Sequence, residues 1–439
     1  DGHAAGGTGD AAAGGRPRCD GRHGESTPMR IPAALRIYGR RLDPYLIVPM
    51  AGLILIGMLV VYSATEFPDS ARAGFFLRHL LAFPIAIAAM LVFMVLPLRL
   101  LEDFAYVLHA IALVLLIGVL VAGIEVYGAR RWLGAGPLRM QPSEFAKLTT
   151  ILVLARFLST KRHDPARLSN LGAVLGLALL PLLLVLKQPD LGTSGAFVAF
   201  AATMLVWAGL PGLHLLLLVS PLAGLILGKH WLAWGAFLVV SLVVLVRSRM
   251  PWLVIGAFVL VQLAVFIGGP IAWGHLEPYQ KARLTTFLDP GQDPGGAGYQ
   301  LLQSKIAVGS GGMWGKGFLK GSQKALAFLP QQHTDFIFSV VGEEFGFLGS
   351  LAVLVLFLAL VFRAFYLALH CRSPFSGLLA VGLGTLILYH SAVNMAMTVG
   401  LLPVTGLPLP LISYGGTFQL TIYATLGLLL NISAHRYDY

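Results

Sequence analysis

Long apolar runs recur along most of the 439-residue chain, and they limit what it can fold into. A helix needs about 20 apolar residues to cross the hydrocarbon core of a bilayer, and about twelve runs approach that length. The runs are 45–63, 75–96, 104–123, 141–159, 171–186, 191–209, 211–228, 230–246, 251–273, 336–362, 377–396 and 411–432. A few are weak because they are short or open with polar residues. The sequence therefore predicts an all-α polytopic membrane protein with about ten to twelve transmembrane helices and a large extracytoplasmic loop.

Composition excludes a water-soluble globule. Hydrophobic residues make up 57% of the chain and charged residues only 12%, whereas soluble domains carry about 25% charged residues. The net charge of +11 is typical of a membrane protein with basic cytoplasmic edges. Because the basic residues are not gathered in one patch with aromatic residues between them, no nucleic-acid partner is expected. Cys19 and Cys371 are too few for a disulfide framework or a cysteine-based metal site.

Four segments follow from this pattern. Residues 1–44 form an N-terminal tail, in which 1–28 is a disordered stretch, an upstream extension or a remnant of cloning, because it is rich in Gly, Ala and Arg. Residues 45–273 and 336–439 hold the membrane helices. Residues 274–335 form the large extracytoplasmic loop, which has too many apolar residues for disorder and is expected to fold back onto the helices as a lid or platform.

The distribution of Lys and Arg sets the expected orientation. With the N-terminus inside, cytoplasmic connections carry Arg30, Arg36, Arg40, Arg41, Arg99, Lys161, Arg162, Arg167, Arg247, Arg249, Arg363, Arg372 and Arg436. An even number of spans then places both termini in the cytoplasm and the 274–335 loop outside. Arg130, Arg131, Arg139 and Lys187 fall on the outer side against the rule. They indicate either an external polyanion or structural roles at helix ends.

One span begins with polar residues that have two interpretations. In the segment Gln141–Lys147, Glu144 and Lys147 have i,i+3 spacing, so both side chains share one face of a helix. An internal salt bridge would explain the pair. Alternatively, this face lines a wet cavity that opens outward, with Gln141 nearest its mouth.

Further charged residues stand at the outer ends of neighbouring spans. Arg130 and Arg131 carry two guanidinium groups suited to phosphate. Lys187 adds a cation and Asp190 a carboxylate, although Asp190 could simply start the following helix.

The outer loop carries two carboxylates before its glycines. Asp289 and Asp293 each precede proline, a pairing common in turns, so each alone is more easily explained as a turn residue. A carboxylate held over a basic, partly dehydrated cavity is nevertheless the simplest general base for a sugar hydroxyl.

The rest of the loop gives weaker indications. Gly311–Lys316 superficially resembles a phosphate-binding P-loop, but its spacing fails and Gly317 replaces the required Ser or Thr, so a nucleotide site is rejected. His333 and Asp335 could cap the next helix, and one histidine with scattered acids is weak support for a metal. Glu343 and Glu344 would then be inward polar residues or paired charges.

Taken together, the motifs resemble the SEDS family (shape, elongation, division and sporulation) of polytopic peptidoglycan polymerases. The matching segments are Gly128–Trp132, Gln141–Lys147, Gln188–Gly192, Asp293-Pro294 with Gly298–Gln300, Leu329-Pro330 with His333–Phe338, and Pro408–Gly416. They occur in family order over nearly the whole chain after Met29. The segments Gln303–Gly312 and Gly400–Pro403 are more similar to the RodA elongation branch than to the FtsW division branch.

The resemblance implies roles for particular residues. The essential acid of the family's Asp-Pro-x-Gly-x-Gly-Tyr motif falls on Asp293, with Asp289 as second choice. The residues expected to bind substrate are Arg130, Arg131, Gln141, Glu144, Lys147, Lys187, Asp190, Lys305, His333 and Asp335. Family members commonly have about ten helices, so the stretch 211–273 looks as if it holds an inserted helix pair.

The resemblance also implies the reaction and its setting. Lipid II would be polymerised into glycan strands in the bacterial inner membrane during cell-wall elongation and rod-shape maintenance, by inverting transfer with release of undecaprenyl diphosphate. The partner would be a class B penicillin-binding protein, the cross-linking transpeptidase. A divalent cation could assist the diphosphate, but the sequence assigns it no ligands.

Two other functions remain open at this stage. A lipid II flippase or transporter would also need a charged cavity, although no inverted repeat is evident. A scaffold that only positions a partner enzyme would leave the outer carboxylate and cations dispensable.

Overall fold

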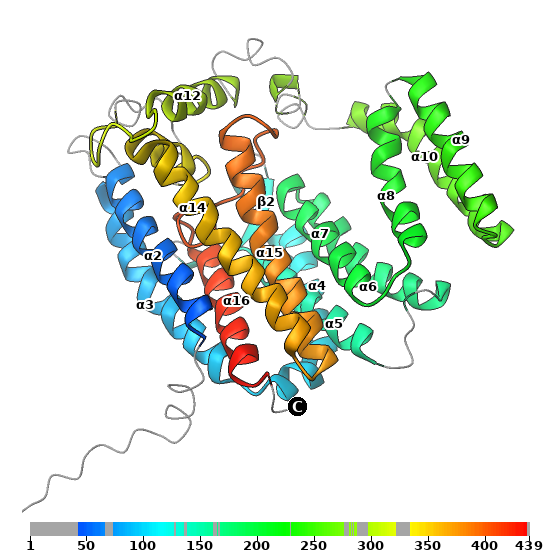
Figure 1. Ribbon diagram of the computed structural model, residues 1–439, viewed down its shortest axis with the longest axis horizontal. Helices are drawn as coiled ribbons and strands as arrows, with labels where there is room; N and C mark the ends of the chain where they lie inside the picture. Colours follow the sequence, from blue (N-terminus) through cyan, green and yellow to red (C-terminus); the bar gives the residue numbers. More distant parts are fainter. Residues whose placement is uncertain are drawn as a thin grey trace, which may run out of the picture. The chain divides into compact units, whose positions relative to one another are not determined.

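The computed structural model describes residues 43–65, 73–126, 129–135, 138–160, 165, 167–228, 230–275, 281, 283, 285–287, 297–321 and 334–436. The chain divides into residues 1–40 and 41–439, and every described residue lies in the second part. The helices in Figure 1 are α2 (Pro44–Thr65), α3 (Ala73–Val95), α4 (Leu98–Ala122), α5 (Pro142–Ser159), α6 (Leu168–Leu186), α7 (Leu191–Trp207), α8 (Gly212–Leu227), α9 (Trp231–Arg247), α10 (Trp252–His275), α12 (Ala297–Ser310), α14 (Ile337–His370), α15 (Pro374–Thr398) and α16 (Gly416–Ala434).

The predicted all-α polytopic membrane fold is confirmed. Within the described residues, eight helices are long and apolar enough to cross a membrane, namely α2, α3, α4, α6, α10, α14, α15 and α16. α7, α8 and α9 are apolar but shorter. α5 is 18 residues long and carries Glu144, Lys147 and Arg156, so its charge sets it apart from the others.

A small antiparallel sheet between α4 and α5 was not expected from the sequence. Its strands are β1 (Ile124–Val126), β2 (Ala129–Ala135) and β3 (Leu138–Met140), in the order β1-β2-β3. The sheet lies over the ends of these helices, because β2 contacts both α4 and α5. It therefore carries Arg130 and Arg131 on a pleated ribbon above the helix ends.

α5, α15 and α16 form the centre of the helix bundle. α5 contacts α4, α6, α7, α15 and α16, and the most apolar windows of α15 and α16 are 78% and 89% buried. The corresponding share is 17% for α3 and 28% for α4, whose exposed apolar side chains face outward. Polar residues thus gather on the helices that are shielded from lipid, as the cost of unpaired polar groups in hydrocarbon requires.

α8, α9 and α10 pack on one another, and α8 also contacts α7. Gly224 of α8 lies against Gln262 of α10, and Gly228 lies against Phe266, so α8 and α10 run parallel, with α9 between them in sequence. Three spans in succession end on the same side of the bundle as one span would. The three helices between α7 and the outer loop therefore fit the inserted helix pair expected from the sequence.

Several helix boundaries differ from the expected runs; for example, α4 begins at Leu98 instead of residue 104, and α15 spans Pro374–Thr398 instead of 377–396. α14 continues to His370 instead of ending near residue 362, because apolar and aromatic residues continue its pattern. α16 begins at Gly416 instead of residue 411. The preceding segment is held in a non-helical path, because the Ser413 hydroxyl accepts a hydrogen bond from the backbone N–H of Leu409 at 2.8 Å.

The tightest helix contact generates a stability prediction. A Cβ added to Gly427 of α16 would lie far inside van der Waals contact with the carbonyl oxygen of Met90 on α3, whereas a Cβ on Gly118 of α4 would meet nothing within 4 Å. We expect Gly427→Ala to destabilise the protein by about 1–3 kcal/mol, because the helices must separate. Gly118→Ala should leave stability unchanged or raise it by about 0.4–1 kcal/mol. Melting temperatures of the two purified variants in detergent check this, and equal values would contradict the packing argument.

Candidate functional site

The two arginines of β2 have different surroundings. Side chains alternate along a strand, so Arg130 and Arg131 point to opposite faces. Arg130 lies 3.6 Å from Glu125, and these side chains are 56% and 59% exposed. Arg131 points toward the start of α7, where its Nε donates to the carbonyl of Gln188 at 3.0 Å and its Nη1 lies 3.9 Å from the carboxylate of Asp190. The strand therefore fixes one guanidinium inward and leaves the other at the surface.

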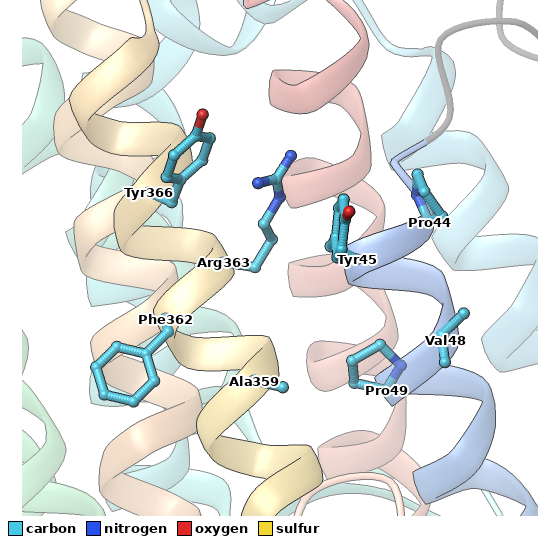
Figure 2. Close-up of a pocket in the computed structure, with 8 residues that line it drawn as sticks. All are labelled: Pro44, Tyr45, Val48, Pro49, Ala359, Phe362, Arg363 and Tyr366. Carbon is cyan, nitrogen blue, oxygen red and sulfur yellow. The ribbon is translucent and has the colours of Figure 1, made fainter.

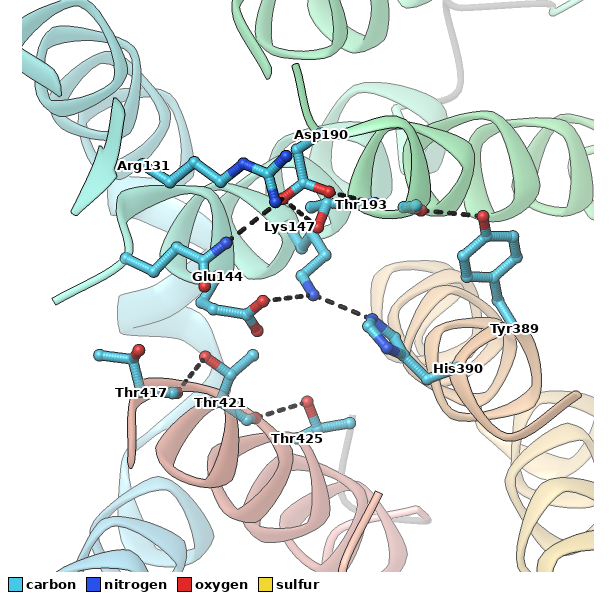
Figure 3. Close-up of polar contacts among 12 residues, drawn as sticks. Arg131, Glu144, Lys147, Asp190, Thr193, Tyr389, His390, Thr417, Thr421 and Thr425 are labelled. Carbon is cyan, nitrogen blue, oxygen red and sulfur yellow. Dashed lines mark hydrogen bonds and ion pairs between the residues drawn. The ribbon is translucent and has the colours of Figure 1, made fainter. Parts of the chain in front are cut away.

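The start of α5 carries Glu144 and Lys147, for which the sequence allowed two interpretations. Gln141 is the N-cap residue, and one turn later Lys147 Nζ lies 2.9 Å from Glu144 Oε1. Lys147 Nζ is also 2.9 Å from Nε2 of His390 on α15 (Figure 3), and it lies 5.6 Å from the ring centre of Phe418 on α16. Lys147 and His390 are both 0% exposed. The internal salt bridge is thus present, and a histidine from another helix shares its lysine.

Asp190 connects the salt bridge region to Arg131. Its carboxylate caps α7 by accepting from the backbone N–H and the hydroxyl of Thr193, at 3.1 and 2.9 Å. Gln141 Nε2 donates to the same carboxylate at 3.4 Å. Asp190 therefore both starts α7 and holds groups from β2 and α5. The polar core cluster, as we use the term below, consists of Arg131, Gln141, Glu144, Lys147, Asp190 and His390.

The segment 334–336, which precedes α14, is tied down above this region. Asn394 of α15 donates from Nδ2 to the carbonyls of Asp335 and Leu407, at 2.8 and 2.7 Å. The hydroxyl of Ser413 donates to the carbonyl of Thr334 at 2.6 Å. The segment that ends the outer loop is therefore held by α15 and by the chain that leads into α16.

Asp335 has a perturbed carboxyl group. Burial raises its pKa to about 6, while the charge of Arg283 and a hydrogen bond from Thr334 oppose the rise. Asp190 raises the pKa slightly further and Arg131 lowers it, so Asp335 is within electrostatic reach of the polar core cluster. Asp335 does not cap α14 as one interpretation of the sequence allowed, because Phe336 is the N-cap residue and no side chain caps it.

Two of the three lysines predicted for the site, Lys187 and Lys305, lie apart from the cluster. Lys305 of α12 extends over Gly400, which has a φ of +79°, while the neighbouring Ser304 donates to the carbonyl of Thr398 at 2.8 Å. These contacts place part of the outer loop on the end of α15. Lys187 ends α6, and its side chain is exposed.

Three acidic or basic residues of the expected site, Asp293, Asp289 and His333, lie outside the described residues. The assignment of Asp293 as the essential acid remains a prediction. Among the described residues, no group of three or more His, Cys, Asp or Glu side chains could hold a metal ion.

Sequence reasoning missed several residues of the site. His390 and Asn394, one turn apart on α15, are fully buried polar side chains in a helix that is long and apolar enough to cross a membrane. The rule that ionisable groups at membrane depth have partners or functions would have identified His390. Tyr389, which donates to the carbonyl of Gly192 at 2.9 Å, gave no such indication. Arg283 lies in the loop without a motif, so only the fold brings it near Asp335.

The glycine-rich segment 311–321 packs on α14 and forms a second polar contact. Lys316 and Gly317 donate from their backbone N–H groups to the carbonyls of Glu343 and Glu344, and Lys316 Nζ lies 2.8 Å from Glu343 Oε1. The Glu344 carboxylate accepts from Ser63 of α2 at 2.6 Å.

The glycines of this segment have a structural explanation. A Cβ at Gly311 or Gly315 would collide with the backbone of α14, which is broken at Gly346 with a φ of +64°. Close backbone packing therefore accounts for the glycines, which agrees with the rejection of a P-loop.

Comparison with known proteins identifies the family. The sequence profile of the FtsW/RodA/SpoVE cell cycle proteins matches residues 44–234 and 232–438, two segments that meet at the start of α9. The peptidoglycan glycosyltransferase MrdB of Escherichia coli (strain K12) is 37% identical over 395 residues, which cover 90% of this chain and 94% of MrdB. The peptidoglycan glycosyltransferase RodA of Treponema pallidum (strain Nichols) is 33% identical over 426 residues, covering 90% and 98%.

A solved structure gives the same result. One chain of a peptidoglycan synthase complex that coordinates polymerization and crosslinking aligns with a TM-score of 0.68 and 30% identity. The alignment covers 91% of this chain and 99% of that one. The chain therefore belongs to the FtsW/RodA/SpoVE family of cell cycle proteins, the SEDS family that its motifs resemble.

Proposed function

We propose that this chain, a peptidoglycan glycosyltransferase of the RodA-like elongation branch, polymerises lipid II by inverting transfer, with Asp293 as general base. The Asp293 carboxylate would take the proton from the acceptor's sugar hydroxyl as that oxygen attacks the anomeric carbon of the donor. The bond to undecaprenyl diphosphate would break on the opposite face, so no covalent sugar intermediate is required. The product strand would serve cell-wall elongation and rod-shape maintenance.

One observation supports this proposal above the others. Arg131 and Arg283, which come from β2 and the outer loop, are both within electrostatic reach of Asp335 at the end of that loop. Arg131 is fixed there by the Gln188 carbonyl and Asp190. Preorganised cations of this kind stabilise the charge that develops on a departing diphosphate without reorganising during the reaction.

The remaining predicted residues have different roles in this proposal, depending on how close to the substrate they would lie. Gln141, Asp190 and Asp335 would orient Arg131 and the substrate. Lys305, His333, Arg130 and Lys187 would supply further contacts or attract the anionic lipid from the rim. Glu144 and Lys147 are buried beneath Gln141, so we propose that they position the start of α5 and do not touch the substrate themselves.

The chain is a multi-pass membrane protein, and we propose a setting for it that extends this description. In this proposal it lies in the bacterial inner membrane, with both termini in the cytoplasm and the polar core cluster at the extracytoplasmic side. The partner would be a class B penicillin-binding protein. This is supported by the similarity to one chain of a peptidoglycan synthase complex.

A lipid II flippase or transporter is the alternative function. It would require a path through the bundle, yet Lys147 and His390 at the centre are completely buried and in contact with each other. Purified protein in vesicles distinguishes the two functions. The enzyme makes glycan polymer from lipid II, whereas a flippase moves labelled lipid across the bilayer without polymer.

The base assignment predicts a selective loss of activity. Asp293→Asn should insert and fold, yet polymerise purified lipid II about a hundredfold to ten-thousandfold more slowly, because an amide cannot accept the hydroxyl proton. Asp289→Asn is the matched control, four residues away, and should keep most of its activity. Glycan products separated on a gel in the presence of the cognate transpeptidase measure both. Full activity of Asp293→Asn would refute the assignment.

The buried ion pair of Glu144 and Lys147 predicts that a second substitution restores the stability lost in a single variant. Lys147→Met should destabilise the protein by about 3–5 kcal/mol, because it leaves the carboxyl group of Glu144 buried without its partner. The double variant Glu144→Gln/Lys147→Met should recover much of this stability. Melting temperatures in detergent measure the recovery, and lipid II polymerisation by the double variant tests the positioning role. If the double variant is stable and as active as the wild type, the pair has no role beyond stability.

The raised pKa of Asp335 predicts a pH dependence of stability. Because the pKa is about 6 in the folded protein and 3.8 in the reference state, protonation favours the folded form. This contribution is complete below pH 3.8 and is lost as the pH rises through about 6. Relative to Asp335→Asn, the wild type should therefore lose melting temperature between about pH 4 and 6. Parallel curves for the two proteins over this range would contradict the assignment.

A further inference from the structure

A pocket of about 630 Å³ opens at the end of the bundle where α2 begins and α14 ends. Figure 2 shows it along these two helices, with Arg363 of α14 and Tyr45 of α2 next to each other between them. The side chains of Tyr45, Val48 and Phe362 are 67%, 65% and 68% exposed. The pocket therefore opens on the outer surface of the helices, where lipid surrounds a membrane protein.

Among the residues that the structure describes, Arg363 is the only charged one that lines this pocket. Its Nε donates to Oδ2 of Asp43 at 2.7 Å, and its guanidinium carbon lies 5.0 Å from the ring centre of Tyr45 and 4.4 Å from that of Tyr366. Neither Nη1 nor Nη2 makes a hydrogen bond to any residue that the structure describes. Two strong donors are thus held between aromatic rings with hydrogen-bonding capacity left over.

The ion pair is oriented with its negative end inward. Asp43 is 5% exposed, and its carboxylate also accepts from the hydroxyl of Ser433 on α16 and from the backbone N–H of Tyr45. The Arg363 side chain is 18% exposed. A molecule in the pocket would therefore meet the guanidinium before the carboxylate that neutralises it. Arg372 and Arg436 add positive charge where α14 ends. The two residues are close together there, because the backbone N–H of Arg372 donates to the carbonyl of Arg436 at 3.3 Å.

Polarity changes with depth along α14. Arg363 stands eight residues before Cys371, the C-cap residue of α14, or about 12 Å from it along the helix. Ala359, one turn deeper, and Phe362 line the pocket with apolar surface. The order from the helix end inward is thus phenol and guanidinium first, then hydrocarbon, which is the order of groups along a phospholipid.

We propose that this pocket binds one anionic phospholipid from the leaflet at this end of the helices. The phosphate would accept hydrogen bonds from Nη1 and Nη2 of Arg363, with the phenols of Tyr45 and Tyr366 beside it. The first part of an acyl chain would lie on Ala359 and Phe362. The site is separate from the polar core cluster, because α14 and α15 are antiparallel neighbours and His390 lies toward the opposite end of α15.

The test blocks the pocket without touching the ion pair. Ala359→Phe fills it, and Ala352→Phe is the matched control, because it places the same side chain on an exposed position of α14 two turns away. Each protein is reconstituted in bilayers of equal phosphatidylglycerol and phosphatidylcholine, and retained lipids are counted by native mass spectrometry. We expect the wild type and Ala352→Phe to retain one phosphatidylglycerol in preference to phosphatidylcholine. Retention should fall about tenfold in Ala359→Phe.

A second variant tests the headgroup contact. Arg363→Lys keeps a cation beside Asp43 but lacks the planar fork, so the preference for phosphatidylglycerol should weaken while total lipid retention persists. Equal retention of the two lipids by the wild type would overturn the proposal. It is also wrong if Ala359→Phe retains as much phosphatidylglycerol as Ala352→Phe. If Ala359→Phe instead fails to co-purify with a co-expressed class B penicillin-binding protein, the proposed partner, the pocket holds a protein helix and the proposal is overturned as well.

Discussion

The structure depends on a buried ammonium group that three helices surround. Lys147 of α5 is fully enclosed, with Glu144 on its own helix, His390 of α15 and the ring of Phe418 of α16 around it. A lone charge at that depth would cost several kcal/mol, so the partners must be present together whenever the bundle is assembled. This requirement specifies which faces of α5, α15 and α16 meet. Apolar packing alone, which is interchangeable with lipid contact, would not specify them.

Most of the fold could be predicted because hydrophobic length is a local property. The runs at 45–63 and 251–273 correspond closely to α2 and α10. Errors arose where backbone conformation depends on distant partners. α16 begins five residues later than the run suggests because Ser413 holds the preceding chain, and the strand pairing that forms β1–β3 was not visible as periodicity. A sheet of three short strands depends on turn geometry and on the helix ends below it, not on hydrophobic length.

The candidate site was predictable to the extent that its residues lie in motifs. Arg131, Gln141, Glu144, Lys147 and Asp190 were identified from sequence and meet in one cluster. Position within a motif did not reveal orientation: Arg130 and Arg131 are adjacent in sequence, yet only the second points inward. His390 and Arg283 were missed because their roles come from tertiary contacts, from α15 beside α5 and from the loop beside Asp335.

The attachment of segment 311–321 to α14 has a mechanical consequence. Where Gly346 interrupts the helix, Gly312 and Met313 accept hydrogen bonds from the backbone N–H groups of Phe347 and Leu348. Main-chain bonds therefore join the segment to the longest helix on both sides of this break, since Lys316 and Gly317 also donate to the carbonyls of Glu343 and Glu344. The segment thus supplies hydrogen-bond partners to α14 at the point where the helix's own backbone pattern is broken, so the two parts of α14 are braced against bending there.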